Sequence, residues 1–369
     1  MRYLSFFFFI ALLSVFTVVH AQKVQTADSI IYRDAAQLAV YGKAHADDVP
    51  RYRRLPAAMD TVVREPLRRL GCNSAGLYVR FCTDAPDIYV RWSNTGYTMS
   101  HMTNCGVGGL DLYALIDGSW LFVGSAFDRC DADHTEHERC IVANMEPMKR
   151  EYMLYLSLYD EVKTLEIGVA EDYVVEPSTL NSPRSESPVV MYGTSILQGG
   201  CASRPGMAHT NIIARRLDRT VINLGFSGNA FLDYDIARLM ASVAQPSVFV
   251  LDYVPNAKVD TIALKGETFY RILRKAHPEV PIVFVEDPQF AHSVVNNKVA
   301  DEIASRNRAQ HELYERLLRD GERNIYYVGS EGMTEQEDFV DGTHFTDLGM
   351  THYADHLTPI LKGILSAEK

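Results

Sequence analysis

From residue 189 onward, short apolar segments alternate with segments of helical periodicity. Each apolar run has the length of a buried strand, and the runs lie at residues 189–192, 220–222, 248–251, 282–285 and 325–328. Helices are expected at residues 209–217, 233–242, 261–277, 296–320 and 347–365. Strands that alternate with helices form a parallel sheet with helices on both faces. The sequence therefore predicts a three-layer α/β/α domain over residues 189–369.

The first half of the chain has a different period. Apolar and polar residues alternate with period two at residues 77–81, 88–92, 112–116, 120–123 and 153–158. Asp117 and Gly118 separate two of these runs, which is a strong signal for a β-hairpin. We expect a smaller all-β sandwich, similar to a jelly roll, over residues 22–175. Residues 176–188 contain three prolines and are predicted to be a linker between the domains.

The N-terminal residues 1–21 have the pattern of a secretory signal. Arg2 precedes an apolar run over residues 4–19, and Ala21 lies at the expected cleavage point before Gln22. The run is shorter than the roughly 20 residues needed to span a bilayer, so we expect no membrane span after cleavage. The protein is predicted to be exported, either to the periplasm or to the medium. Export permits disulfides among the six cysteines, but their spacing does not decide between bridges and buried thiols.

Three residues have the chemistry of a serine hydrolase. Ser195 directly follows a predicted strand, and Gly193 frees the backbone to turn and present the serine hydroxyl. Asp341 and His344 are three residues apart, so a single turn can hold both side chains on one side. A serine attacks a carbonyl only when a histidine takes its proton, and an acid must orient that histidine.

Two further residues follow neighbouring strands. Gly228 lies in the segment after residues 220–222, and Asn256 lies in the segment after residues 248–251. The carboxyl ends of parallel strands meet at one edge of a sheet, which is where active sites of such folds lie. The backbone N–H groups of Ser195 and Gly228 and the side-chain amide of Asn256 are therefore candidate donors to an oxyanion.

The order Ser, Gly, Asn and Asp-x-x-His resembles that of the SGNH hydrolases, also called GDSL-type esterases and lipases. The resemblance covers residues 188–365 and implies a flavodoxin-like sheet, with Ser195 as nucleophile, His344 as general base and Asp341 as its orienting acid. It also implies an oxyanion hole made by Ser195, Gly228 and Asn256, and a reaction without metal or cofactor. Thr194 stands where the family has aspartate, but that residue is not part of the triad. The α/β-hydrolase elbow Gly-x-Ser-x-Gly is not matched, because Leu197 occupies its last position.

The predicted function is an ester hydrolase that forms an acyl-enzyme. Export, the added β domain and the resemblance favour a carbohydrate O-acetyl esterase acting on poly- or oligosaccharides. Three alternatives stay open: an esterase, thioesterase or lysophospholipase on small or lipid substrates, an acyltransferase, and a non-catalytic glycan-binding protein. The oligomeric state is not predicted.

Several other features have two interpretations. Arg204 either contacts a polar or acidic substrate or pairs with a nearby carboxylate. Trp92 and Trp120 either stack on sugars or belong to the sandwich core. The polar run at residues 131–138 is expected to be a solvated loop between strands and not a metal site.

Composition argues against some partners. A net charge of −11 with dispersed Lys and Arg makes nucleic acids and anionic membranes unlikely partners. The glycine-rich segments lack the lysine of a nucleotide-binding loop, so no dinucleotide cofactor is expected.

Overall fold

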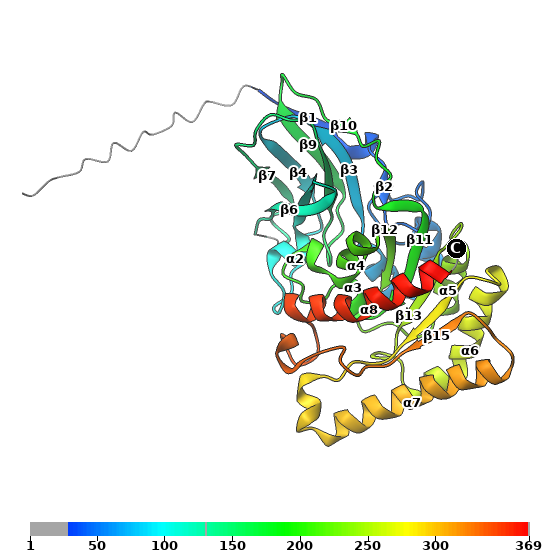
Figure 1. Cartoon of the computed structure of the whole chain (residues 1–369). Helices are drawn as coiled ribbons and strands as arrows, with labels where there is room; N and C mark the ends of the chain where they lie inside the picture. Colours follow the sequence, from blue (N-terminus) through cyan, green and yellow to red (C-terminus); the bar gives the residue numbers. More distant parts are fainter. Residues whose placement is uncertain (1–28, 130, 368–369) are drawn as a thin grey trace, which may run out of the picture.

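The computed structural model describes residues 29–129 and 131–367, which form a β-sandwich beside an α/β domain (Figure 1). The predicted secretory signal in residues 1–21 lies outside the described residues. Among the described helices, none has the length and apolar character needed to cross a membrane.

The C-terminal domain contains a parallel sheet of five strands. Its strand order is β12–β11–β13–β14–β15, which is the flavodoxin-like order 2-1-3-4-5. The strands span Arg184–Gly193 (β11), Arg219–Gly225 (β12), Val248–Asp252 (β13), Ile282–Val285 (β14) and Ile325–Val328 (β15). The chain crosses from one side of β11 to the other, so β11 has β12 and β13 as its neighbours. This observation confirms the predicted fold class.

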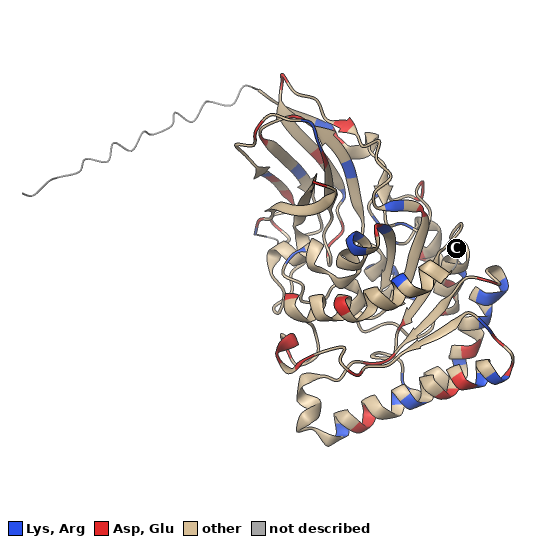
Figure 2. Cartoon of the chain, viewed as in Figure 1, with Lys and Arg blue, Asp and Glu red and all other residues tan. Residues whose placement is uncertain are grey.

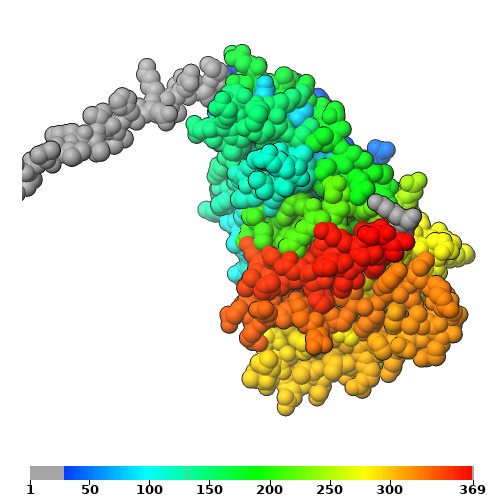
Figure 3. Space-filling model, viewed as in Figure 1, coloured from blue at the N-terminus to red at the C-terminus, as the bar shows by residue number. Residues whose placement is uncertain are grey.

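Helices cover both faces of this sheet. The helices α4 (His209–Leu217) and α8 (Asp347–Ala367) lie on one face. The helices α5 (Tyr234–Ala241), α6 (Val259–Ala276) and α7 (Asn297–Arg319) pack on the other. Helix α8 runs across the molecular surface (red in Figure 3), and α7 contains basic and acidic residues along its length (blue and red in Figure 2).

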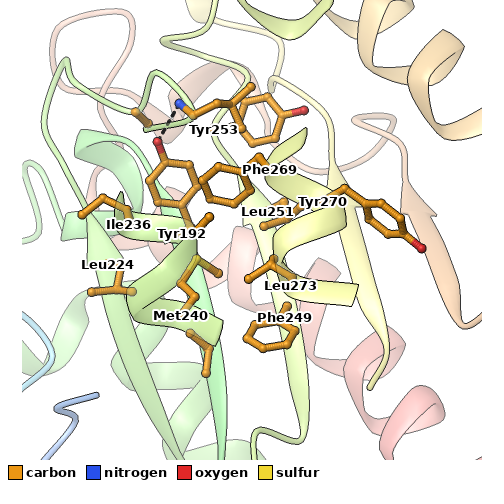
Figure 4. Close-up of a cluster of buried hydrophobic side chains, with 14 of the residues drawn as sticks. Tyr192, Leu224, Ile236, Met240, Phe249, Leu251, Tyr253, Phe269, Tyr270 and Leu273 are labelled. Atoms are coloured by element: carbon orange, nitrogen blue, oxygen red, sulfur yellow. Dashed lines mark hydrogen bonds between the residues drawn. The ribbon is translucent and has the colours of Figure 1, made fainter. Parts of the chain in front are cut away.

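The core under α5 and α6 holds strand β11 through packing and a hydrogen bond. Tyr192 of β11 stacks on Phe269 of α6, with ring centroids 4.9 Å apart. The Leu232 N–H donates to the Tyr192 hydroxyl at 2.9 Å, shown by the dashed line in Figure 4. Because its apolar ring and its hydroxyl are both satisfied, Tyr192 fixes the strand three residues before Ser195.

The N-terminal domain consists of two antiparallel sheets. The first has the order β1–β9–β4–β7 and contains Ile30–Asp34 (β1), Thr164–Ala170 (β9), Ile88–Ser93 (β4) and Glu136–Val142 (β7). The second has the order β10–β3–β8–β5–β6 and contains Glu176–Pro177 (β10), Tyr78–Thr83 (β3), Arg150–Tyr155 (β8), Leu110–Ile116 (β5) and Ser119–Ala126 (β6). The short strand β2 (Val40–Tyr41) also pairs with β3. Asp117 and Gly118 both have positive φ and join β5 to β6, as the hairpin signal predicts.

Two expectations about this half of the chain need correction. Strand β7 begins at Glu136, so residues 131–138 are not a loop throughout. The predicted linker is also partly strand, since Glu176 and Pro177 pair with β3 and strand β11 already begins at Arg184. Proline is compatible with strand β10 because β10 lies at the edge of its sheet.

The two tryptophans differ in environment. Trp92 is buried in the sandwich core, and its indole N–H donates to the Gly108 carbonyl at 3.0 Å. Trp120 is half-buried, and its indole N–H donates to the Ser182 hydroxyl at 3.3 Å. These contacts match the core interpretation of Trp92 and engage the polar atom of Trp120 within the protein.

The segment before β3 packs against the α/β domain. Leu67 and Leu70 of helix α1 (Glu65–Gly71) belong to the same apolar cluster as the strands of the parallel sheet. Arg54 is 1% exposed and donates to the carbonyls of Leu70 at 2.7 Å, Asn73 at 3.0 Å and Asn223 at 3.3 Å. It also donates to the Gly225 carbonyl at the end of β12. A buried guanidinium is tolerated there because carbonyl oxygens surround it.

Candidate active site

Ser195 lies at the carboxyl end of the central strand β11. It is the first residue of the short helix α3 (Ser195–Gln198), which the Thr194 hydroxyl caps by accepting from the Ile196 N–H at 3.3 Å. Threonine, like aspartate, is a good capping residue because its side-chain oxygen satisfies an otherwise unpaired N–H. The Thr194 departure from the family motif therefore keeps the turn that presents Ser195.

Two glycines allow this turn to pack tightly. A Cβ on Gly193 would lie 2.5 Å from the Asp252 carbonyl oxygen, and a Cβ on Gly225 would lie 2.3 Å from the Gln198 N atom. Neither contact is possible for a larger residue without moving backbone. The ends of β11, β12 and β13 therefore converge at helix α3 because these positions are glycine.

The structure brings Ser195, His344 and Asp341 into one hydrogen-bonded chain. The Ser195 Oγ lies 2.8 Å from His344 Nε2, and His344 Nδ1 lies 2.8 Å from Asp341 Oδ2. Ser195 is buried, whereas the side chains of His344 and Asp341 are 21% and 37% exposed. This arrangement can pass the serine proton to the histidine, with the carboxylate holding the ring in place.

Asp341 is kept ionised by its neighbours. Burial alone would raise its pKa, but hydrogen bonds from the His344 N–H, the His344 ring and the Thr343 N–H outweigh that effect. The resulting pKa is about 2. The group beside the His344 ring is therefore a carboxylate at every pH where the enzyme would work.

Gly228 and Asn256 lie on two loops that contact each other. The Asn256 Oδ1 accepts from the Ala230 N–H at 3.2 Å, two residues after Gly228. This bond uses the amide oxygen and leaves the Asn256 NH₂ as a donor. Gly228 has φ +65° in an open position, a conformation that favours glycine.

Gln198 holds the Gly228 loop beside helix α3. Its Oε1 accepts from the Ser227 N–H at 3.1 Å, and its Nε2 donates to Asn73 Oδ1 at 3.0 Å. Gln198 is fully buried. The residue before Gly228 is thereby fixed to the same short helix that begins at Ser195.

The N-terminal domain also reaches this site, which the sequence did not reveal. The Tyr159 hydroxyl donates to the Ser195 carbonyl at 3.2 Å, and the His101 ring lies 5.6 Å from the His344 ring between centroids. Tyr159 comes just after the strand predicted at residues 153–158, and His101 lies in a loop. Neither position carries a local signal, because the contact depends on how two domains pack.

Four side chains at this site have metal-binding atoms. One ligand atom each from His101, Cys201, Asp341 and His344 lies within 4.8 Å of the others. Burial, and the charge of Asp341, raise the pKa of the Cys201 thiol to about 12. A metal ion held by this set would compete with the hydrogen bond between Asp341 and His344. The described cysteines, Cys72, Cys82, Cys105, Cys140 and Cys201, are free thiols.

Arg204 pairs with a nearby carboxylate, which is the second of the two interpretations that the sequence allowed. It donates to Asp111 Oδ2 at 2.7 Å and to the Tyr113 hydroxyl at 2.8 Å, and its guanidinium lies 3.7 Å from the Phe122 ring centroid. Asp111 is fully buried and also accepts from the Gly206 N–H at 2.8 Å and the Ser125 hydroxyl at 2.7 Å. We call Arg204, Asp111, Tyr113 and Gly206 the domain-joining cluster, because it links β5 to the loop after α3. Internal pairing therefore replaces the predicted substrate contact of Arg204.

Asp252, at the end of β13, is another buried carboxyl near the site. Burial raises its pKa to about 8, although the Tyr353 hydroxyl, which donates to it at 2.7 Å, opposes the shift. Asp252 is therefore largely protonated at neutral pH. Its backbone carbonyl lies close to Gly193, so β13 and β11 are in tight contact where the two strands end.

Two family comparisons cover almost the whole chain. A sequence model of the GDSL-like lipase/acylhydrolase family matches residues 186–362. A second, the N-terminus of SGNH-hydrolase-type esterases, matches residues 30–175. A solved structure from Bacteroides ovatus, described as that of a GDSL-like lipase, is 32% identical with a TM-score of 0.86, and the match covers 92% of this chain and 98% of that one. The chain belongs to the GDSL-like lipase/acylhydrolase family. It is a hydrolase that acts on ester bonds.

The second of these families is named after the motif Gly-x-Asp-Leu-Tyr. Here the motif is residues 109–113, and it supplies both Asp111 and Tyr113 of the domain-joining cluster. The sequence signal that could have identified it is an aspartate inside an otherwise apolar strand. In this protein the motif joins the two domains.

More distant structures share the fold. The salicylyl-acyltransferase SsfX3 from a tetracycline biosynthetic pathway is 18% identical with a TM-score of 0.73, covering 92% of this chain and 98% of that chain. A family two carbohydrate esterase from Clostridium thermocellum is 14% identical with a TM-score of 0.58, covering 80% of this chain and 94% of that chain. No curated protein matches the chain.

Proposed function

We propose that this hydrolase removes short acyl groups, acetyl first, from the hydroxyls of poly- or oligosaccharides. The observation that carries the hydrolytic part is the continuous chain from Ser195 Oγ through His344 to Asp341, with both links at 2.8 Å. The same geometry would serve any ester whose carbonyl carbon reaches Ser195.

In the proposed reaction, Ser195 Oγ attacks the ester carbonyl while His344 Nε2 takes its proton. The Ser195 and Gly228 N–H groups and the Asn256 amide donate to the oxyanion as it forms. His344 then returns the proton to the departing alcohol, and the acyl group stays on Ser195. Water, deprotonated by His344, attacks the acyl-enzyme, and His344 returns that proton to Ser195 Oγ as the bond between Oγ and the acyl group breaks and the acid leaves. Asp341 remains a carboxylate throughout and stabilises the imidazolium.

The carbohydrate part of the proposal is supported by the surroundings of the triad. A cavity of about 340 Å³ borders Tyr159 and Ser227, and its lining includes Arg69, Asn73 and Glu161. These polar side chains offer hydrogen bonds to hydroxyl groups, and the apolar lining residues Leu70, Tyr97 and Met99 offer contacts to the apolar face of a sugar ring. The structurally similar Clostridium thermocellum esterase was solved in complex with cellohexaose, which favours the same class of substrate. We also propose that the mature enzyme acts outside the cytoplasm, where such polysaccharides occur.

The test is acetate release from acetylated polysaccharides, measured beside p-nitrophenyl esters of increasing chain length. Wild-type enzyme should release acetate from the glycans and prefer short esters, and Ser195→Ala should lose both activities. A preference for long acyl chains would overturn the carbohydrate proposal. The same assay with acceptor sugars present shows whether an alcohol replaces water in the second step.

A further inference from the structure

A cavity beside the triad is walled mostly by the N-terminal domain. Its volume is about 340 Å³, and it is lined by the end of helix α1, by residues 95–99 and by residues 159–161. Two contacts connect it to the site: the Tyr159 hydroxyl donates to the Ser195 carbonyl, and the lining residue Ser227 directly precedes Gly228. A group bound in this cavity therefore lies next to the candidate oxyanion loop.

The wall that carries Tyr97 is held in place by a buried carboxylate. Asp160 is fully buried and accepts from the N–H groups of Thr95 at 3.0 Å and Tyr97 at 2.9 Å. The Thr95 hydroxyl donates to the same carboxylate. With its backbone fixed in this way, the Tyr97 side chain is nevertheless 42% exposed. An exposed aromatic ring on a rigid backbone binds a flat apolar face at little entropic cost.

The cavity is lined by one basic and one acidic side chain, Arg69 and Glu161. Arg69 is exposed in the last turn of α1, and Glu161 is paired with Arg53 at 2.9 Å. Asn73 contributes an amide that is already oriented by its bonds to Gln198 and to the Tyr159 carbonyl. Such a mixture of donors and acceptors, without an excess of one charge, fits a neutral molecule with many hydroxyls better than an ion.

We propose that this cavity binds the alcohol half of the ester, as a neutral pyranose ring. Tyr97 stacks on the apolar face of the sugar, while Arg69 and Glu161 hydrogen-bond to its hydroxyls. The acyl group then extends toward Ser195. This inference rests on the proposed function, and it makes the N-terminal domain a determinant of substrate choice.

The experiment compares two substrates for each variant: an O-acetylated neutral oligosaccharide and methyl acetate, whose alcohol half has no ring to place in the cavity. Tyr97→Ala and Arg69→Gln should each lower kcat/KM for the acetylated sugar about tenfold, as expected for a central aromatic or arginine contact. Both variants should leave kcat/KM for methyl acetate within about twofold of wild type, because methanol is too small to contact Tyr97 or Arg69. Tyr97→Phe should keep the sugar activity, because the stacking ring remains.

Matched controls and outcomes separate this proposal from the proposed function. Arg68→Gln changes the neighbouring exposed arginine of α1, which does not line the cavity, and should change neither activity. If wild type cleaves acetylated sugars but Tyr97→Ala and Arg69→Gln do not alter kcat/KM, the cavity assignment is wrong while the carbohydrate esterase stands. If wild type cleaves p-nitrophenyl acetate but no acetylated sugar, the proposed substrate class fails as well. Greater activity on acetylated uronic acids than on neutral sugars would overturn the neutral-ring assignment.

Discussion

The triad and the domain-joining cluster are both built on an aspartate paired with a basic side chain, yet their surroundings differ. In the triad, Asp341 and His344 are partly exposed. Their hydrogen bonds lead to the Ser195 hydroxyl, which can transfer its proton to His344. In the domain-joining cluster, Asp111 is fully buried, and its carboxylate accepts from Arg204, Ser125 and Gly206. A buried carboxylate whose hydrogen bonds are all made stabilises the fold. An accessible set of hydrogen-bonded side chains with a transferable proton can catalyse a reaction.

The same contrast appears in the pKa values. Hydrogen bonds hold the pKa of Asp341 at about 2 in spite of burial. Burial instead raises the pKa of Asp111, although Arg204 and hydrogen bonds oppose the shift. Asp111 therefore depends on its partners to remain charged, and losing any of them leaves a costly buried group.

The largest expected effect is the loss of kcat when the nucleophile of the triad is replaced. Ser195→Ala removes the only atom of the chain that bonds to the acyl group in the proposed reaction. We expect kcat for p-nitrophenyl acetate to fall by at least about 10⁴-fold, with the melting temperature nearly unchanged. Steady-state kinetics and thermal unfolding followed by circular dichroism measure the two quantities.

Ser247→Ala is the matched control, because Ser247 is also buried but lies beside the amino end of β13, where its hydroxyl donates to the Pro188 carbonyl. It should keep full activity. Substantial hydrolysis by Ser195→Ala would remove Ser195 from the proposed role.

The next effect is a loss of unfolding free energy when the domain-joining cluster is broken. Asp111→Ala leaves Arg204 without its partner, and breaking a buried pair in this way costs about 3–5 kcal/mol of unfolding free energy. Denaturant unfolding should show this loss, while kcat per folded molecule should change less than threefold, roughly the effect of a site without contact to substrate.

Replacing both partners sharpens this test. The double variant Asp111→Leu with Arg204→Leu should lose less stability than Asp111→Ala, because no unpaired charge remains. If instead Arg204→Ala keeps wild-type stability and raises KM, Arg204 contacts substrate, which is the other interpretation that the sequence allowed, and the contrast between the two clusters is wrong.

A third variant tests the oxyanion assignment. Asn256→Ala removes one of three proposed donors and should lower kcat by about 10²–10³-fold, with KM changed much less. The measurement is kcat and KM on a short ester, together with the melting temperature, because Asn256 also accepts from the Ala230 N–H.

Asn256→Asp is the informative companion. It keeps an acceptor for Ala230 but places a negative charge where the oxyanion would form, so it should be at least as inactive as Asn256→Ala. Full activity in Asn256→Asp would exclude Asn256 from the oxyanion hole.

The last effect is a pH dependence of stability from Asp252. Its folded pKa of about 8 lies above its unfolded pKa of about 4. The folded state therefore holds a proton that the unfolded state releases, and this contribution to stability is lost as pH rises from about 4 to about 8. Asp252→Asn has no such proton, so its melting temperature relative to wild type should be higher at pH 8 than at pH 5.

Glu312→Gln, on the exposed face of α7, serves as the control and should track wild type at both pH values. An Asp252→Asn variant whose melting temperature follows wild type across this range would show that Asp252 is already ionised in the folded protein.

Local patterns were enough to predict the α/β domain. Each strand of the parallel sheet is a short apolar run, and each helix has its own periodicity, so neither depends on distant residues for its signal. The chemistry of Ser195, Asp341 and His344 was equally local, because an acid and a base three residues apart share one turn. These features made the fold class and the family predictable, and both are confirmed.

Strand β7 was missed for the opposite reason. Strand β7 begins with four polar or charged residues, Glu136 to Arg139, and it is a strand because β4 pairs with it. Strand propensity depends on such partners more than on the residues themselves.

The amino-acid sequence alone determined the parallel sheet, the turn at Ser195 and the acid and base that face it, since each rests on contacts within a few residues. Only the tertiary structure decided that Arg204 pairs with Asp111, that Tyr159 and His101 reach the triad, and that residues of α1 and of the loop around Tyr97 enclose a cavity beside it. Those contacts join residues about 40 to 240 positions apart. No local pattern encodes them, because they form only when the two domains pack together.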